Sequence, residues 1–272
     1  MNATGLPKSD SREDTVRSPR ERSRWREALP PLVTLGILVG CWELVASQGW
    51  GTIGIPRIGE TFRASVDMAQ SAELWQAARE SAYIFTAGLI LGVVVSVVVG
   101  LVLGSFRHLD VAFTPFIFAA FTTPFVAVIP LVLLVFGYQE AGKIAIVFFL
   151  TAIITTLQTI EGVRSVSNEY LEVALSFTAP AWRRTLEIVL PGAAPFIVVG
   201  VRLAIGRALV GIVVAEFETV DAGLGGLIRG LAQSYSHESV IFPVFLYVAT
   251  GIGLTALVFR VEKRLRVWRG EP

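Results

Sequence analysis

A phosphate-binding motif is the first candidate for chemistry in this sequence. The segment Gly137-Tyr-Gln-Glu-Ala-Gly-Lys143 matches most of a P-loop. The next residue, Ile144, has no hydroxyl to hold Mg²⁺, and the segment joins two strongly apolar stretches, so no strand is expected before it. We therefore expect no nucleotide at this segment, and no cofactor bound by this chain.

Hydrolytic and metal chemistry is not expected either. His108 and His237 are far apart, and the sequence contains no His-Glu-x-x-His motif and no plausible Ser/His/Asp arrangement. Cys41 is the only cysteine, which excludes an intrachain disulfide and a cysteine metal cluster. The sequence predicts a chain that is not an enzyme, with no catalytic residue and no metal ligand.

The composition is typical of an integral membrane protein. Of the 272 residues, 53% are hydrophobic and 17% are charged, and the mean hydropathy is +0.65. These values lie well outside those of ordinary soluble domains. The net charge is +1, so the overall charge does not favour nucleic acid as a partner. We expect the chain to lie in a lipid bilayer.

Six apolar segments approach the length of about 20 residues that crosses the hydrocarbon of a bilayer. We expect them to be helices, because backbone polar groups in lipid must be satisfied internally. The predicted spans are residues 30–47, 82–104, 113–136, 143–160, 192–215 and 239–259. Glycines four residues apart, beginning at Gly36, Gly88 and Gly100, predict close helix packing. The expected fold class is all-α and integral to the membrane.

Basic residues predict the orientation, because cytoplasmic segments of membrane proteins carry an excess of Lys and Arg. With the N-terminus inside, 16 of the 23 Lys and Arg residues are cytoplasmic, five are external and two lie within the fifth span. We expect a disordered cytoplasmic tail over residues 1–29 and a basic cytoplasmic tail over residues 261–272. The loop at residues 161–191 then faces the cytoplasm. Residues 48–81 are expected outside, with an amphipathic interfacial helix.

Three ionisable residues lie in or beside the fifth span, where a charge is costly and usually faces protein or water. Arg202 and Arg207 differ by about 140° around an ideal helix, so they face different surroundings. Glu216 lies about 21 Å from Arg202 along the helix axis, which excludes a pair between them. The arginines are expected to stabilise packing. The alternative places Arg202, Arg207 and Glu216 on a translocation path, where a guanidinium attracts an anion.

The most specific motif lies between Glu172 and Pro191, in a polar and partly amphipathic segment flanked by apolar ones. It resembles the "EAA" loop of binding-protein-dependent ABC import permeases, in which Glu-Ala-Ala is followed by Gly and then by Ile-x-x-Pro. The positions in the family register are Glu172, Ala174, Trp182 and Pro191. Two positions depart from it, because Val173 replaces the middle Ala and Thr178 stands in place of Gly.

The resemblance implies that this loop is a helix seated in a groove on an ATPase. A small residue such as Ala174 lets the helix sit deep, and Glu172 can meet a basic residue of the partner or favour the helix start. A family Gly would end the helix with a positive φ. Thr178 cannot do so cheaply, whereas Pro180 biases Ala179 away from helical geometry, so we expect the break to form by that other route.

The resemblance covers roughly residues 30–260, and the segment 201–216 is similar to the nitrate, sulfonate and taurine branch. It implies a type I ABC importer permease fold over residues 30–260, in the bacterial plasma (inner) membrane. The implied assembly is a homodimer of this chain, two cytoplasmic ABC ATPase subunits that bind ATP and Mg²⁺, and an extracytoplasmic substrate-binding protein. The implied substrate is a small anion such as a sulfonate, taurine or nitrate, with thiamine-precursor-like compounds as a further possibility. An ion-gradient-driven secondary transporter and a non-transporting membrane scaffold are the alternative classes.

Overall fold

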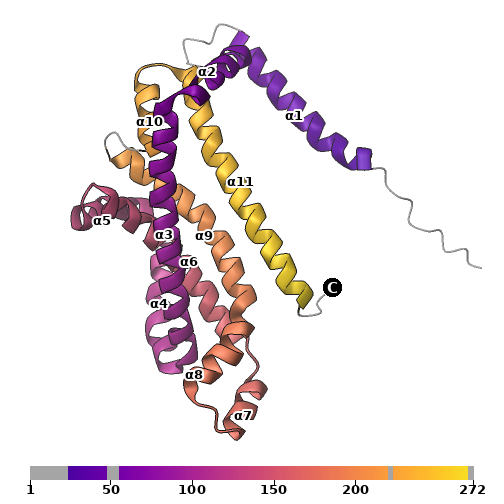
Figure 1. Cartoon of the computed structure of the whole chain (residues 1–272), viewed down its shortest axis with the longest axis vertical. Coiled ribbons are helices and arrows are strands. Elements are labelled where there is room, and N and C mark those ends of the chain that lie inside the picture. Colours follow the sequence, from indigo (N-terminus) through magenta and orange to yellow (C-terminus); the bar gives the residue numbers. More distant parts are fainter. Residues whose placement is uncertain (1–23, 48–54, 220–222, 269–272) are drawn as a thin grey trace, which may run out of the picture.

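Three long helices form the centre of the structure: α3 (Ala72–Ser105), α6 (Glu140–Arg164) and α9 (Leu190–Glu218). The computed structural model describes residues 24–47, 55–219 and 223–268, and these ranges contain helices and no strand. The other helices are α1 (Arg24–Ser47), α2 (Ile58–Gln70), α4 (Arg107–Thr122), α5 (Ile129–Phe136), α7 (Asn168–Ser176), α8 (Ala181–Arg184), α10 (Gly223–Gln233) and α11 (His237–Trp268). Figure 1 shows α10 and α2 at one end of the bundle and α7 and α8 at the other.

Glycines on α3 let α6 approach closely. A Cβ atom added to Gly92 would lie 2.7 Å from the Cβ of Thr151, and one added to Gly100 would lie 2.5 Å from the Cβ of Thr159. Any larger residue would therefore separate the two helices. The predicted close packing of the glycines in the second span is confirmed, and their partner is α6 of the same chain. By contrast, a Cβ at Gly36 would meet nothing within 4 Å among the described atoms.

The polar stripe of α6 lies inside the bundle. Thr151, Thr155 and Thr159 are all 0% exposed. The hydroxyl of Thr159 donates to the carbonyl of Thr155 at 2.7 Å, which satisfies it within the helix. These threonines therefore face protein and not lipid, which explains how a membrane-spanning helix tolerates them. The predicted helix at residues 143–160 is confirmed, with α6 extending beyond it at both ends.

The prediction of one continuous helix at residues 113–136 is wrong. Helix α4 ends at Thr122, and α5 begins at Ile129 after a 3-10 turn, with a bend of 94° between them. Pro124 explains the break, since proline disfavours helical geometry in the preceding residue, and Thr123 has an extended ψ of 133°. Figure 1 shows α5 projecting sideways from the bundle.

The described residues contain four helices that are long and apolar enough to cross a membrane, or five if the bent pair is one span. A shorter apolar helix covers Val33–Ser47 in α1. Counting this helix as well would give six, so six spans remain a prediction. Residues 1–23 of the expected disordered tail lie outside the described residues, and α11 continues to Trp268 through most of the expected basic tail.

The segment at residues 48–81, which we expect to be external, contains helix α2 and the first residues of α3. Helix α2 lies within the segment where the sequence predicts an interfacial helix, and its position at the interface remains a prediction. Helix α3 begins at Ala72, ten residues before the predicted start, where the Ser71 hydroxyl caps it by accepting from the Leu74 N–H at 3.2 Å. With 34 residues, α3 is about 51 Å long and therefore exceeds the thickness of the hydrocarbon core.

Helix α1 is attached to the start of α2 by two hydrogen bonds. The Trp42 Nε1–H donates to the carbonyl of Pro56 at 3.0 Å, and Glu43 Oε2 accepts from the Ile58 N–H at 3.2 Å. Glu43 thus satisfies a free backbone donor at a helix start, which accounts for its charge near the end of an apolar helix. Figure 1 shows α1 leading away from the bundle beyond this contact.

Candidate functional site

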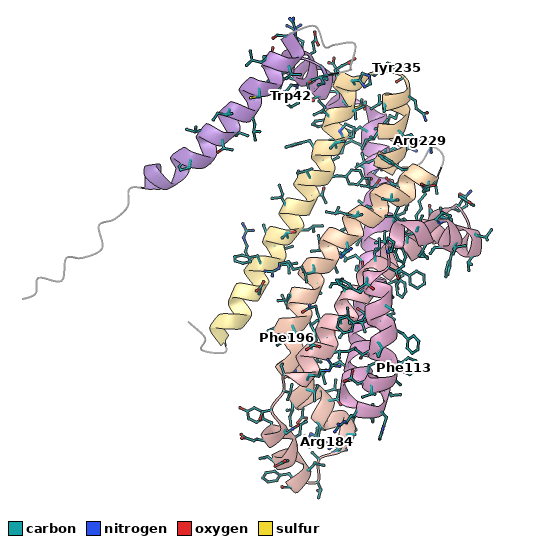
Figure 2. All side chains as sticks on the ribbon, turned by 180° about the vertical axis from the view of Figure 1, so that it is seen from behind. Trp42, Phe113, Arg184, Phe196, Arg229 and Tyr235 are labelled. Carbon is teal, nitrogen blue, oxygen red and sulfur yellow. The ribbon has the colours of Figure 1, made fainter. Side chains whose placement is uncertain are left out.

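The loop that carries the motif folds into α7 and α8 at one end of the bundle. Ser167 begins α7, with its hydroxyl accepting from the Glu169 N–H at 3.3 Å. The short helix α8 begins after Pro180 and ends at Arg184, which Figure 2 shows at the same end of the molecule. The helix in this loop and the break in it, both expected from the sequence, are therefore present in the structure.

The end of α7 corrects the expectation for Thr178. This residue itself adopts a positive φ of 53°, as a glycine would, so the expected alternative route through Ala179 is wrong. The Thr178 N–H donates to the carbonyl of Leu175, and the Ala179 N–H donates to that of Ala174. This is the Schellman motif, and its bonds to the last helical carbonyls offset a left-handed cost of about 1–2 kcal/mol.

The outer surface of the loop is rich in exposed apolar side chains. The exposed fractions are 57% for Val173, 80% for Phe177 and 64% for Trp182, and Glu172 is exposed as well. Ala174 is only 8% exposed and lies inside the loop itself. Large aromatic side chains presented to solvent on a loop are typical of a protein-binding surface. We call Val173, Phe177 and Trp182 the loop face.

Helix α8 is joined to α9 without a break. Ala181 to Glu218 form one helical stretch of 38 residues, with a π-helical turn at Thr185–Val189. The Leu190 N–H donates to the carbonyl of Thr185, five residues back. Pro191 follows this turn in the first turn of α9, where a missing N–H is tolerated. The backbone therefore runs from α8 into α9 as one helical rod that contains this π-helical turn.

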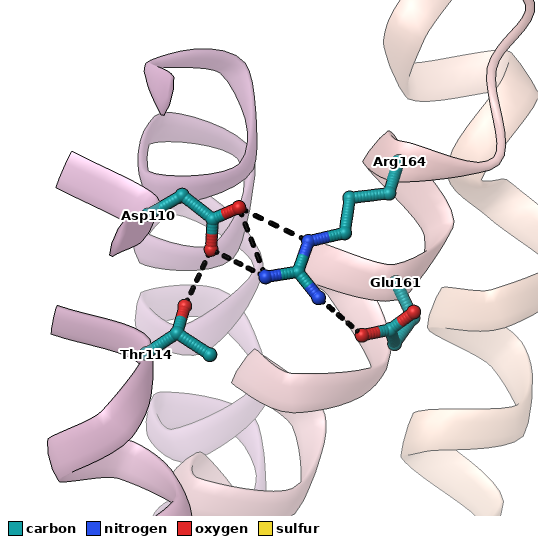
Figure 3. Close-up of polar contacts among 4 residues, drawn as sticks. All are labelled: Asp110, Thr114, Glu161 and Arg164. Carbon is teal, nitrogen blue, oxygen red and sulfur yellow. Dashed lines mark hydrogen bonds and ion pairs between the residues drawn. The ribbon is translucent and has the colours of Figure 1, made fainter. Parts of the chain in front are cut away.

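An ion-paired cluster holds α4 against the end of α6 (Figure 3). Arg164 Nη2 lies 2.7 Å from Asp110 Oδ1, and Arg164 Nε donates to Asp110 Oδ2 at 3.0 Å. Glu161 accepts from the other guanidinium nitrogen at 2.6 Å, and the hydroxyl of Thr114 donates to Asp110. This two-point arginine–carboxylate geometry fixes the position from which the α7–α8 loop departs.

The two arginines of α9 have different surroundings. Arg202 Nη1 lies 2.7 Å from Glu262 Oε2 of α11, and Glu262 is only 4% exposed. Arg207 is exposed, and its guanidinium carbon lies 5.4 Å from the centroid of the Phe121 ring. The expectation that the two face different surroundings is confirmed. In this structure Arg202 joins two helices, whereas Arg207 forms no ion pair with a described carboxylate.

Glu216 is 0% exposed and connects four helices. Its Oε1 accepts from the Ser81 hydroxyl of α3 at 2.6 Å. Its Oε2 accepts from the Gly225 N–H of α10 at 2.7 Å and from the Tyr247 hydroxyl of α11 at 2.5 Å. The ammonium group of Lys143, itself 3% exposed, lies near enough for an electrostatic interaction. We call Glu216, Ser81, Tyr247 and Gly225 the Glu216 node.

Helix α10 can reach this node because its first residues are glycines. A Cβ at Gly223, whose φ is +76°, would lie 2.0 Å from Glu216 Oε1, and one at Gly225 would lie 2.6 Å from the Glu216 Cβ. In the other direction, Arg229 of α10 donates to the Phe217 carbonyl near the end of α9 at 2.7 Å. Each helix thus satisfies a free backbone group of the other, and the glycine cluster forms the packed start of α10.

The P-loop-like segment forms a tight turn between α5 and α6. A Cβ at Gly142 would lie 1.9 Å from the carbonyl oxygen of Gly137, and Lys143 is buried. The element before the turn is the helix α5, whereas a P-loop follows a strand.

The contacts that the sequence did not predict join residues far apart in the chain. Ser81 and Glu216 are separated by 135 positions, and Arg202 and Glu262 by 60. One signal was present, since Glu216 directly follows the apolar run of residues 208–215 and a glycine cluster comes after it. Nothing in the sequence identified Ser81 or Tyr247 as its partners.

A bundle of apolar helices with a polar two-helix loop at one end defines a membrane permease. Residues 92–267 match the family described as binding-protein-dependent transport system inner membrane component, and the chain belongs to this family. The resemblance stated from the sequence is thereby confirmed. The protein is a multi-pass inner-membrane permease of the ABC transporter class.

Named relatives have been assigned different substrates. The chain is 30% identical to an aliphatic sulfonates transport permease protein, SsuC, of Escherichia coli, over 82% of this chain and 84% of the relative. It is 27% identical to the formylaminopyrimidine transport permease protein ThiX of Halalkalibacterium halodurans, over 89% and 97%. It is 24% identical to the nitrate import permease protein NrtB of Leptolyngbya laminosa, over 88% of each. These relatives are permease subunits, and this chain is accordingly a non-catalytic subunit.

Proposed function

We propose that this chain forms the transmembrane path of an ATP-driven importer for a small solute, with a sulfonate, taurine, nitrate or similar anion as the favoured substrate. The assembly is a homodimer of this chain with two cytoplasmic ABC ATPase subunits, which bind ATP and Mg²⁺. An extracytoplasmic binding protein delivers the substrate. The names of the relatives support this substrate class, and the formylaminopyrimidine relative keeps a thiamine precursor as the second candidate.

The observation that supports the proposal most directly is the exposed loop face, which lies within the segment that matches the family motif. Glu172, Val173, Ala174, Thr178, Trp182 and Pro191 are the proposed coupling residues. The loop face supplies apolar contact area, Glu172 supplies a charge, and Ala174 and Thr178 shape the loop from within. The rod from α8 through α9 transmits movement of the ATPase into the membrane helices.

Arg207 is the residue that we propose on the translocation path. It lies in the middle of α9, it is exposed in the single chain, and its guanidinium is not paired with a described carboxylate. Such a group attracts an anion by charge and by bidentate geometry. Arg202 and Glu216 are each held by hydrogen bonds to other helices, so we assign them to packing.

Orientation is tested by labelling single cysteines in a Cys41→Ala background. Ser167 lies beside the motif loop and Gln233 lies at the end of α10, and both are exposed. We expect a membrane-impermeant maleimide to label Ser167→Cys from the cytoplasmic side and Gln233→Cys from the outside, because basic residues favour the loop end inside. Labelling of both from the same side would contradict the span count and the cytoplasmic position of the loop.

A further inference from the structure

A cavity of about 470 Å³ lies at the end of the bundle that carries the α7–α8 loop. It is bounded by the ends of α3 and α6, the start of α4, and the α7–α8 loop. Three arginines line it, Arg107, Arg164 and Arg184, against a single carboxylate, Asp110. The cavity therefore carries an excess of positive charge.

Two of these arginines are available to a ligand. Asp110 is already bound at two points by Arg164, so it does not neutralise the others. The side chains of Arg107 and Arg184 form no hydrogen bond or ion pair with the described residues, and the Nε of Arg184 is buried. The guanidinium groups of Arg107 and Arg184 therefore keep donors that an anion in the cavity would bind.

Part of the cavity wall is apolar and continues along the surface of α3. It includes Leu101, Val102 and Phe106, of which Val102 is 43% and Phe106 58% exposed. A ligand that fills the cavity therefore meets arginines on one side and hydrocarbon on the other. Free phosphate would use only the first of these two surfaces.

We propose that this cavity binds the phosphate group of an anionic phospholipid. The planar guanidinium fork matches phosphate oxygens, and basic pockets between transmembrane helices at the cytoplasmic surface are typical lipid headgroup sites. The acyl chains would follow Val102 and Phe106 along α3. Since the cavity touches Asn168 of α7 and Ala181 of α8, the bound lipid braces the coupling loop. The inference rests on the proposed function in two respects only. These are the position of this end of the bundle at the cytoplasmic side of the membrane, and the role of the α7–α8 loop in coupling to the ATPase.

The test measures lipid retention by the full-length permease without ATPase or substrate. The permease is exchanged into phosphatidylcholine nanodiscs with a minor fraction of phosphatidylglycerol, and native mass spectrometry counts the lipids that stay bound. We expect selective retention of phosphatidylglycerol, and a loss of at least about tenfold in its affinity in the double variant Arg107→Gln/Arg184→Gln. The matched control Arg183→Gln/Arg260→Gln removes two exposed arginines that do not line the cavity, and should retain the lipid.

A second experiment distinguishes the phosphate group of a lipid from free inorganic phosphate as the ligand. Inorganic phosphate is titrated into the permease in nanodiscs of phosphatidylcholine alone, and the thermal unfolding midpoint is followed. We expect no stabilisation. An increase that depends on Arg107 and Arg184 would assign the cavity to a soluble anion and overturn the lipid source. Equal retention of phosphatidylglycerol by the wild type and the double variant would overturn the site. Arg184→Lys, which keeps the charge, should retain part of the affinity and shows that the cavity still folds.

Discussion

Replacing Phe177 and Trp182 together by Asp is expected to abolish copurification of the ABC ATPase with the permease. Both side chains are exposed on the loop face, and truncation of a buried aromatic anchor in an interface costs about 2 kcal/mol or more. Each change therefore weakens binding by roughly thirtyfold, before the cost of burying the new carboxylate. The measurement is the amount of ATPase retained on the affinity-tagged permease after washing.

The matched control for this experiment is Tyr235→Asp. Tyr235 is 82% exposed, close to the 80% of Phe177, but it lies at the opposite end of the bundle (Figure 2). It should leave copurification unchanged. Glu172→Lys should give a smaller loss, of roughly tenfold, because it removes one charge-assisted contact. A bulky residue at Ala174 is less informative, since this buried position would disturb the loop itself. Full copurification of the Phe177/Trp182 variant would remove the coupling assignment.

The second large effect is expected at the Glu216 node. Glu216→Ala leaves the buried hydroxyls of Ser81 and Tyr247 and the Gly225 N–H without their acceptor. We expect a loss of about 3 kcal/mol or more in the free energy of unfolding. The thermal unfolding midpoint in detergent should fall by roughly 5–10 °C. The cysteine at Gln233 should also be labelled faster, because α10 loses the hydrogen bond from Gly225 to α9 and keeps only that from Arg229 to Phe217.

Glu218→Ala provides the control, since this exposed glutamate lies two residues further along α9. It should leave the midpoint and the labelling rate unchanged. The alternative from the sequence, in which Glu216 borders the translocation path, leads to a different result. In that case Glu216→Ala would alter transport while leaving the thermal midpoint and the position of α10 as in the wild type.

Local features of this fold were largely predictable from the sequence. Hydrophobic length predicted the long helices α3, α6, α9 and α11, whereas the count of six spans remains a prediction. The glycines of α3 predicted a close helix contact, although not that α6 would be the partner. The break at Thr123 and Pro124 was missed because the apolar run continues across it, and hydropathy does not register a change in helix direction.

Thr178 adopts a positive φ, which the conformational preference of threonine does not predict. A β-branched residue disfavours positive φ, and the sequence therefore pointed to Pro180 as the source of the break. In the structure, the two closing hydrogen bonds to α7 decide the conformation, and Thr178 accepts the strain. The family position thus keeps its geometry with a different residue.

The charged contacts were not predictable because they depend on how the helices are rotated and where they cross. Arg202 meets Glu262 and Glu216 meets Tyr247 between α9 and α11, and Asp110 meets Arg164 between α4 and α6. Periodicity assigns a residue to a face of its own helix, but it does not say which helix covers that face. For this reason the sequence left Arg202 and Glu216 as candidates for the translocation path.

The most direct test of the central claim is uptake into proteoliposomes that contain the permease with its copurifying ATPase, with ATP enclosed and the cognate binding protein outside. Labelled taurine, ethanesulfonate, nitrate and formylaminopyrimidine are supplied in separate reactions. We predict accumulation of at least one of these solutes that requires ATP and the binding protein, and that is lost in the Phe177/Trp182 variant. Accumulation that follows an imposed ion gradient without ATP, and that persists in this variant, would contradict the assignment of the chain as the permease of an ATP-driven importer.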